Sequence, residues 1–258
     1  MSPRTVDWLP EPADAAAPRN NGLRERKKRL LRQQLSDTAT EMFVERGFDN
    51  VRITEIAEAC GVSEKTVYNY FPTKESLILD RWQSTPTVLL RGLADPAVTP
   101  IDAALRVLDG ELTSWTAWFA RHPDPSEASA RVRRFADLIQ ATPSLRAYER
   151  DMTDQLVAQA AQVLAARVGL DREDPEPQMA AGALLELWRV QGRSLRRHLD
   201  ATSTSAQIYK LVSSDVQRAA RLLTDGLTSF DTLKRRPPKR RRSGPTRRAG
   251  SGCESPRS

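Results

Sequence analysis

The residues best suited to binding chemistry lie in one short stretch, ACGVSEKTVYNYF, at positions 59–71. Gly61 breaks a helical pattern, and Ser63 can cap the next helix because its hydroxyl accepts hydrogen bonds from the first free amides. The start of such a helix favours a phosphate group or the polar edge of a base. The tyrosines that follow combine a flat apolar ring with a hydroxyl that can reach a phosphate oxygen. These residue types indicate non-covalent binding of nucleic acid.

Catalytic and metal-binding chemistry is not indicated. The two histidines, His122 and His198, lie in a proline-flanked loop and near arginines at the end of a helical pattern. The sequence contains no Ser/His/Asp arrangement, glycine-rich phosphate loop or metal-ligand spacing, so we expect no enzyme activity, no metal and no cofactor. Cys60 and Cys253 are too few for a disulfide framework, which favours a reducing cytoplasm. Cys60 is expected to pack as a small apolar residue, since a redox switch needs a lowered thiol pKa and no sequence neighbour forces one.

The positive charge of the chain is concentrated near its ends. The segment from Lys234 onward contains ten Lys or Arg residues and one acid, Glu254, so it carries +9, whereas the whole chain carries +7 and the remainder −2. Interleaved Pro and Gly predict a disordered basic tail, which either displaces counterions from DNA phosphates or stays solvated. A second basic run, RERKKR, covers Arg24–Arg29. Neither a signal peptide nor a membrane-spanning stretch is indicated, so we expect a cytoplasmic protein without membrane contact.

The elements that must position the binding residues are helices, because apolar residues recur at spacings of three and four. Gly47 is expected to end the first helix, and a second, short helix spans Ile53–Cys60. Thr73 is expected to cap a helix that runs through Trp82. Cap-and-proline signals precede several later helices, and the last helix covers roughly residues 205–229. We therefore predict an all-α protein of about nine helices.

The same pattern divides the chain into four segments. Residues 1–22 are rich in Pro, Ala and Asn and, like residues 231–258, are expected to be disordered. Residues 23–72 hold three short helices, of which the second and third are joined by the tight glycine turn. This arrangement describes a helix-turn-helix DNA-binding domain. Residues 73–230 form a second helical domain.

The segment ITEIAEACGVSEKTVYNYFPTKESL resembles the DNA-binding signature of TetR-type transcriptional regulators, and the preceding FVERGF also fits. The matching residues are Ile56, Ala57, Gly61, Val62, Ser63, Thr66, Tyr68, Phe71, Lys74 and Leu77. The resemblance implies that Lys65 and Thr66 contact base edges. It implies phosphate contacts by Tyr68, Asn69, Tyr70 and Lys74.

Two residues depart from the family pattern. Arg52 stands at the cap of the second helix, where the family usually has Ser or Thr, so a cap oxygen is lost although an arginine can pair with phosphate. Cys60 stands where the family usually has Ala. Arg52, Thr54 and Ser63 complete the predicted DNA-binding set, and Thr54 is also compatible with a merely solvated position.

The resemblance further implies that residues 73–230 contain a ligand pocket and a dimer interface. The segment TPSLRAYERDMTDQLVAQAAQVLAARVGLDREDPEPQMAAGALLELWR resembles the C-terminal domain of the mycofactocin-system regulators of this family, which are associated with long-chain acyl-CoA ligands. The predicted pocket residues are Trp115, Trp118, Phe119, Phe135, Leu138, Tyr148, Met152 and Trp188. Aromatic residues at helical spacing also form ordinary core, so both roles stay open. An anionic head group could meet Arg131, Arg133 and Arg134, or these arginines form a solvated face.

Two helical segments are predicted to pair two copies of the chain. AAGALLELW, at Ala180–Trp188, contains small residues that allow helices to approach closely. The last helix carries an apolar stripe of Ile208, Leu211, Val212, Val216, Ala219, Leu222 and Leu223. Together they predict a four-helix seam in a homodimer, with an intramolecular helix pair as the alternative.

These features and the resemblance predict a DNA-binding transcriptional regulator. We expect a ligand-responsive repressor that binds a palindromic double-stranded DNA operator as a homodimer. It is expected to release the operator when it binds a small apolar effector, such as a long-chain acyl-CoA. An activator of the same family and a DNA-organising protein without ligand response are the alternatives.

Overall fold

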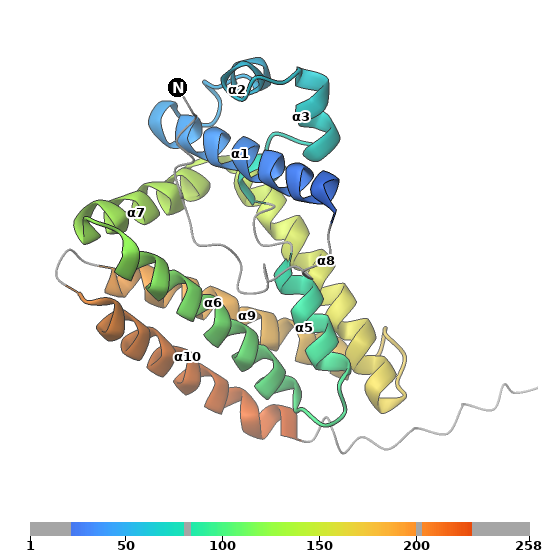
Figure 1. Ribbon diagram of the computed structural model, residues 1–258. Coiled ribbons are helices and arrows are strands. Elements are labelled where there is room, and N and C mark those ends of the chain that lie inside the picture. Colours follow the sequence, from blue (N-terminus) through green and yellow to red (C-terminus); the bar gives the residue numbers. More distant parts are fainter. Residues whose placement is uncertain (1–21, 80–83, 200–202, 229–258) are drawn as a thin grey trace, which may run out of the picture.

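The computed structural model describes residues 22–79, 84–199 and 203–228, and these fold into ten α-helices with no strand among them (Figure 1). The all-α prediction is confirmed, with one helix more than expected. The predicted disordered segments, 1–22 and 231–258, lie outside the described residues apart from Gly22.

The first four helices form the N-terminal unit, whose first three lie at the top of Figure 1. They are α1 (Leu23–Arg46), α2 (Ile53–Ala59), α3 (Glu64–Tyr70) and α4 (Ser76–Leu79). Gly47 ends α1 with a φ of 87°, a conformation that glycine adopts without steric cost. Fully buried residues at spacings of four on α1 build its core-facing side: Leu35, Ala39 and Phe43.

Helix α4 covers the first part of the helix that the sequence predicts after Thr73. Thr73 caps it as expected, since its hydroxyl accepts from the Ser76 amide at 3.2 Å. The described part of the helix runs to Leu79, and its predicted continuation to Trp82 lies outside the described residues. The next described helix, α5, begins at Ser84 and has Pro86 in its first turn, where proline is tolerated.

The C-terminal domain consists of six helices. They are α5 (Ser84–Ala94), α6 (Pro100–Arg121), α7 (Pro125–Ala141), α8 (Pro143–Val168), α9 (Pro175–His198) and α10 (Ser205–Thr228). The predicted proline-led starts of α6, α8 and α9 are confirmed, and α7 also starts with proline. At the start of α6, the Thr99 hydroxyl accepts from the Asp102 amide at 3.1 Å. The residues before α8 and α9 form no side-chain cap hydrogen bond.

Helices α9 and α10 pack along each other and against α6, while α5 packs against α6 and α8 (Figure 1). The guanidinium of Arg167, near the end of α8, donates to the carbonyl oxygens of Asp95 and Val98, both at 2.8 Å. It also lies 3.4 Å from the carbonyl of Leu93, in the last turn of α5. One side chain of α8 therefore fixes the end of α5 and the loop to α6.

The N-terminal unit meets the C-terminal domain where α7 packs against α1, and within the unit α4 also packs against α1. The buried hydroxyl of Ser36 on α1 donates to the carbonyl of Leu77 on α4 at 2.7 Å. Because this bond is buried, α4 and α1 are expected to move as one piece.

Candidate functional site

The turn between α2 and α3 has the geometry that the sequence predicts. Gly61 adopts a φ of 68°, and the amide of Val62 donates back to the carbonyl of Ala57 at 3.0 Å. The Ser63 hydroxyl accepts from the Thr66 amide at 3.2 Å and lies 2.8 Å from the Thr66 hydroxyl. These contacts fix where α3 begins and keep Thr66 in a single orientation.

Helix α3 has one buried and one exposed side. Val67 is fully buried, and Phe71, directly after the helix, is 2% exposed, as expected for its core-facing side. The exposed side chains of the helix include three of the predicted DNA contacts: Lys65, Tyr68 and Asn69. Thr66 is half-buried, and Tyr70 is half-buried and packs against the core. The predicted base-reading and phosphate-binding residues thus share a helix, but only part of them is open to solvent.

The far end of α3 is held by Arg32 of α1, a residue that the sequence pattern does not single out. Its guanidinium donates to the carbonyl of Tyr70 at 2.6 Å and lies 4.3 Å from the ring centroid of Phe71. A cation at the C-terminal end of a helix also complements the helix dipole. Ser63 at one end and Arg32 at the other therefore hold α3 in place.

Lys74 is used inside the domain. Its ammonium donates to the carbonyl of Phe48 at 2.6 Å and lies 4.5 Å from the Phe48 ring centroid and 5.4 Å from that of Phe43. Burial lowers the pKa of Lys74, which is partly offset by nearby carboxylates. The sequence predicts a phosphate contact here, whereas the structure gives Lys74 the task of joining the segment after α3 to the turn between α1 and α2.

The start of α2 compensates for the missing cap oxygen at Arg52. The Glu55 carboxylate accepts from the Arg52 amide at 2.7 Å and from the Arg46 guanidinium at 2.6 Å. Both hydrogen bonds lower the pKa of Glu55, and the bond from the Arg52 amide has the larger effect. The side chains of Arg52 and Thr54 are exposed on this helix, so both are free of core packing.

Cys60 lies half-buried beside α1, with its sulfur 4.0 Å from the carbonyl oxygen of Gln34. Burial raises the pKa of this thiol, with a smaller opposing effect from Thr38. A raised pKa disfavours the reactive thiolate, which supports the packing role expected from the sequence.

The residues predicted to line a ligand pocket lie on α6, α7, α8 and α9. Trp118, Phe119 and Phe135 are buried, with no more than 5% exposure, and the other five are half-buried against the core. The ring centroids of Trp118 and Phe119 are 5.1 Å apart, and that of Trp115 lies 6.4 Å from Trp118. In this structure the aromatic residues of α6 form a packed cluster.

A carboxyl group adjoins this aromatic core. Glu111 on α6 accepts from the Trp188 indole on α9 at 3.0 Å and from the Thr85 hydroxyl on α5 at 2.5 Å. Burial raises the pKa of Glu111, while the two hydrogen bonds oppose the shift. Three helices therefore meet at one acid that favours its neutral form more than an exposed carboxyl does.

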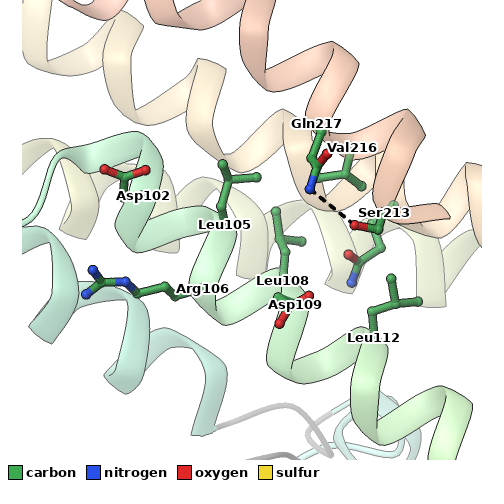
Figure 2. A pocket seen from close by; sticks show the side chains of 10 residues that line it. Asp102, Leu105, Arg106, Leu108, Asp109, Leu112, Ser213, Val216 and Gln217 are labelled. Carbon is green, nitrogen blue, oxygen red and sulfur yellow. Dashed lines mark hydrogen bonds between the residues drawn. The ribbon is translucent and has the colours of Figure 1, made fainter. Parts of the chain in front are cut away.

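A hollow in the described part of the chain lies away from this cluster, between α6 and α10 (Figure 2). It has a volume of about 460 Å³ and is lined by Asp102, Leu105, Arg106, Leu108, Asp109, Leu112, Gln191, Ser213, Val216 and Gln217. None of the eight predicted pocket residues lines it. Two of the three arginines proposed for a head group are engaged, since Arg131 and Arg134 both donate to the Glu127 carboxylate.

The apolar stripe of α10 is divided between the chain's own core and solvent. Ile208, Val212 and Val216 are at most 3% exposed, so this part of the predicted dimer seam is an intramolecular contact. Leu211 and Leu222 remain 43% and 83% exposed, and Met179 on α9 is 72% exposed. These three are expected to meet a second copy of the chain.

The described ranges contain no group of three or more His, Cys, Asp or Glu side chains arranged to hold a metal ion. None of their helices has the length and apolar character that crossing a membrane requires.

Comparisons with known proteins fall on the same two parts of the chain. The family described as bacterial regulatory proteins of the tetR family matches residues 35–80, and the MftR C-terminal domain matches residues 107–227. The chain is 28% identical over 216 residues to the HTH-type transcriptional regulator TcmR of Streptomyces glaucescens, which covers 79% of this chain and 90% of that protein.

Two further relatives align over shorter ranges. A Mycobacterium tuberculosis protein described as a mycofactocin biosynthesis transcriptional regulator, MftR, is 29% identical over 160 residues, or 62% of this chain and 77% of that protein. The HTH-type transcriptional repressor KstR of Rhodococcus jostii is 27% identical over 171 residues, or 66% of this chain and 72% of that protein.

Proposed function

This chain belongs to the TetR family of bacterial regulatory proteins and has a C-terminal domain similar to that of MftR, and on this basis we propose that it is a ligand-responsive repressor of a palindromic operator. It is a DNA-binding transcriptional regulator and not an enzyme. The observation that carries the proposal is the exposed side of α3, a helix fixed at both ends with Lys65, Tyr68 and Asn69 open to solvent.

Helix α3 is proposed to read the operator in the major groove. Lys65 and Thr66, at its start, are the base-reading residues, since the first turn of a recognition helix meets the base edges. Tyr68, Asn69 and Tyr70 are proposed to hold phosphates, together with Arg52, Thr54 and the cap residue Ser63. Lys74 is left out of this set because its ammonium is already bound to Phe48.

Two copies of the chain are proposed to pair through α9 and α10. The exposed apolar side chains of Met179, Leu211 and Leu222 support this surface, because burying them in a second copy removes apolar area from water. A two-fold dimer presents two α3 helices, which is why the operator is expected to be an inverted repeat.

The effector is proposed to be a small apolar molecule, and long-chain acyl-CoAs are the first to test. The packed cluster of Trp115, Trp118 and Phe119 supplies the apolar surface that such a chain would contact. Because this cluster is closely packed, the effector has to separate helices as it enters, and that movement would be coupled to DNA affinity. Trp118→Ala should therefore weaken the response to the effector while operator affinity is retained.

Footprinting and fluorescence anisotropy with the purified full chain test the DNA assignment. A regulator protects one short inverted repeat, whereas a DNA-organising protein covers long stretches. Lys65→Ala with Thr66→Ala should weaken operator binding by about 1–3 kcal/mol for each base that the variant no longer reads, and should relax sequence preference. Lys210→Ala, an exposed lysine on α10, is the matched control and should leave both unchanged.

A reporter gene placed behind the operator separates a repressor from an activator. Repression is the expected output, in line with the description of KstR as a repressor. Unchanged operator affinity and selectivity in the double variant would show that α3 does not read the sequence.

A further inference from the structure

The first turns of α1 project from the folded N-terminal unit. The helix begins at Leu23, twelve residues before the tetR-family match begins at residue 35. Residues 22–30 are all exposed, whereas burial starts with the half-buried residues 31–34. This projecting part contains the basic run Arg24–Arg29, which is not among the DNA contacts proposed above.

Two of its cations lie on the side of α1 that faces α3. Arg32 defines that side, because its guanidinium bonds to the last carbonyl of α3. At about 100° per residue, Arg29 and Lys28 lie three and four residues earlier and only about 60° and 40° away around the helix. Both side chains are exposed.

We infer that Lys28 and Arg29 form a second DNA contact, which binds backbone phosphates beside those held by α3. DNA is the expected occupant because its phosphates carry the opposite charge and because this side of α1 continues the exposed side of α3. A rise of about 1.5 Å per residue places them about 4–6 Å along α1 from Arg32, next to the C-terminal end of α3. One strand of DNA carries a phosphate about every 3.4 Å of axis, so that reach covers one or two neighbouring phosphates. The inference rests on the proposed function.

Glu25 lies on the same stripe, one turn before Lys28 and Arg29, and is the one acid among residues 23–32. Its carboxylate reduces the positive charge that the stripe presents to phosphate. Phosphate binding by this stripe therefore predicts that Glu25→Gln tightens DNA binding, an outcome that a purely structural role of these residues does not predict.

The run also supplies a matched control. Arg26 and Lys27 are also exposed and carry the same charge, but lie about 120° and 140° around the helix from Arg32. The variants Lys28→Gln/Arg29→Gln and Arg26→Gln/Lys27→Gln each remove two positive charges from one helical turn. They differ only in the side of α1 that is changed.

The test measures operator affinity of the full chain as a function of potassium chloride concentration, by fluorescence anisotropy. With Lys28→Gln/Arg29→Gln, the slope of log affinity against log salt should become shallower by about 1.8 per chain, or about 3.6 for a dimer on its operator. Affinity for random DNA should fall by a similar factor, and hydroxyl-radical footprints should lose protection at the outer ends. Arg26→Gln/Lys27→Gln should keep the wild-type slope and footprint, and both variants should keep the wild-type thermal midpoint.

Equal loss in both variants would overturn the inference, since it would mean that only diffuse charge matters. An unchanged salt slope in Lys28→Gln/Arg29→Gln would overturn it as well. Failure of the proposed function gives a different result, because the wild-type chain itself would then protect no inverted repeat.

Discussion

Replacing Lys74 with methionine separates a structural role from phosphate binding. The substitution keeps most of the apolar stem and removes the ammonium that bonds to the Phe48 carbonyl at 2.6 Å and lies 4.5 Å from its ring centroid. A hydrogen bond from a charged group contributes about 1.5–3 kcal/mol, and a cation over an aromatic ring at a partly exposed site about 0.5–1 kcal/mol. The new methionine recovers part of this through burial, so we expect Lys74→Met to lower the free energy of unfolding by about 2–3 kcal/mol.

Urea unfolding followed by circular dichroism, at one fixed chain concentration, measures this loss. Lys65→Met is the comparison variant, because Lys65 is exposed on α3 and should change DNA affinity without changing stability. In the absence of urea, the folded Lys74→Met variant should bind the operator with the wild-type slope of log affinity against log salt. Unchanged unfolding free energy together with a salt slope shallower by about 0.9 per chain would refute the structural assignment and return Lys74 to the phosphate contacts.

Three further substitutions test the turn, the C-terminal core and the dimer. Gly61→Ala should cost about 1 kcal/mol of unfolding free energy in urea, because φ is +68° there while a new Cβ meets no atom within 4 Å; no loss would mean that this turn tolerates an ordinary residue. Burial raises the pKa of Glu111, so the folded chain holds a proton there at pH values where the unfolded chain has lost it. The stability that this proton contributes to the folded chain is fully present below pH 4.5 and is lost as the pH rises through the raised pKa. Glu111→Gln should thus gain stability relative to wild type as pH rises across that window in urea titrations, and a stability difference that does not change with pH would contradict this. Leu222→Asp should raise the dimer dissociation constant in analytical ultracentrifugation without lowering the thermal midpoint of the monomer, since Leu222 is 83% exposed within the chain; an unchanged dissociation constant would move the interface elsewhere.

The features that sequence reasoning predicts correctly are those set by neighbours in the chain. The glycine turn at Gly61, the cap at Ser63 and the buried side of α3 at Val67 and Phe71 each depend on residues within about one or two helical turns. The proline-led starts of α6, α8 and α9 are local in the same sense. Such signals need no knowledge of the tertiary structure.

The features that it misses depend on residues far apart in the sequence. Arg32 meets Tyr70 across 38 positions, and Lys74 meets Phe48 across 26, so nothing local distinguishes either cation from a surface charge. The aromatic residues of α6 have the same spacing whether they line a pocket or fill a core, and here Trp118 is 3% exposed.

The hold of Arg167 on the end of α5 has a consequence for the order in which the chain folds during its synthesis. Its guanidinium bonds to the carbonyls of Asp95 and Val98, which precede it by 72 and 69 positions. At about 5–20 residues per second, a ribosome makes these carbonyls roughly 4–14 s before their donor exists. The N-terminal unit closes its own contacts over much shorter separations, such as the 41 positions between Ser36 and Leu77. The N-terminal unit can therefore fold while the end of α5 and the loop after it are still solvated, before α8 has been made.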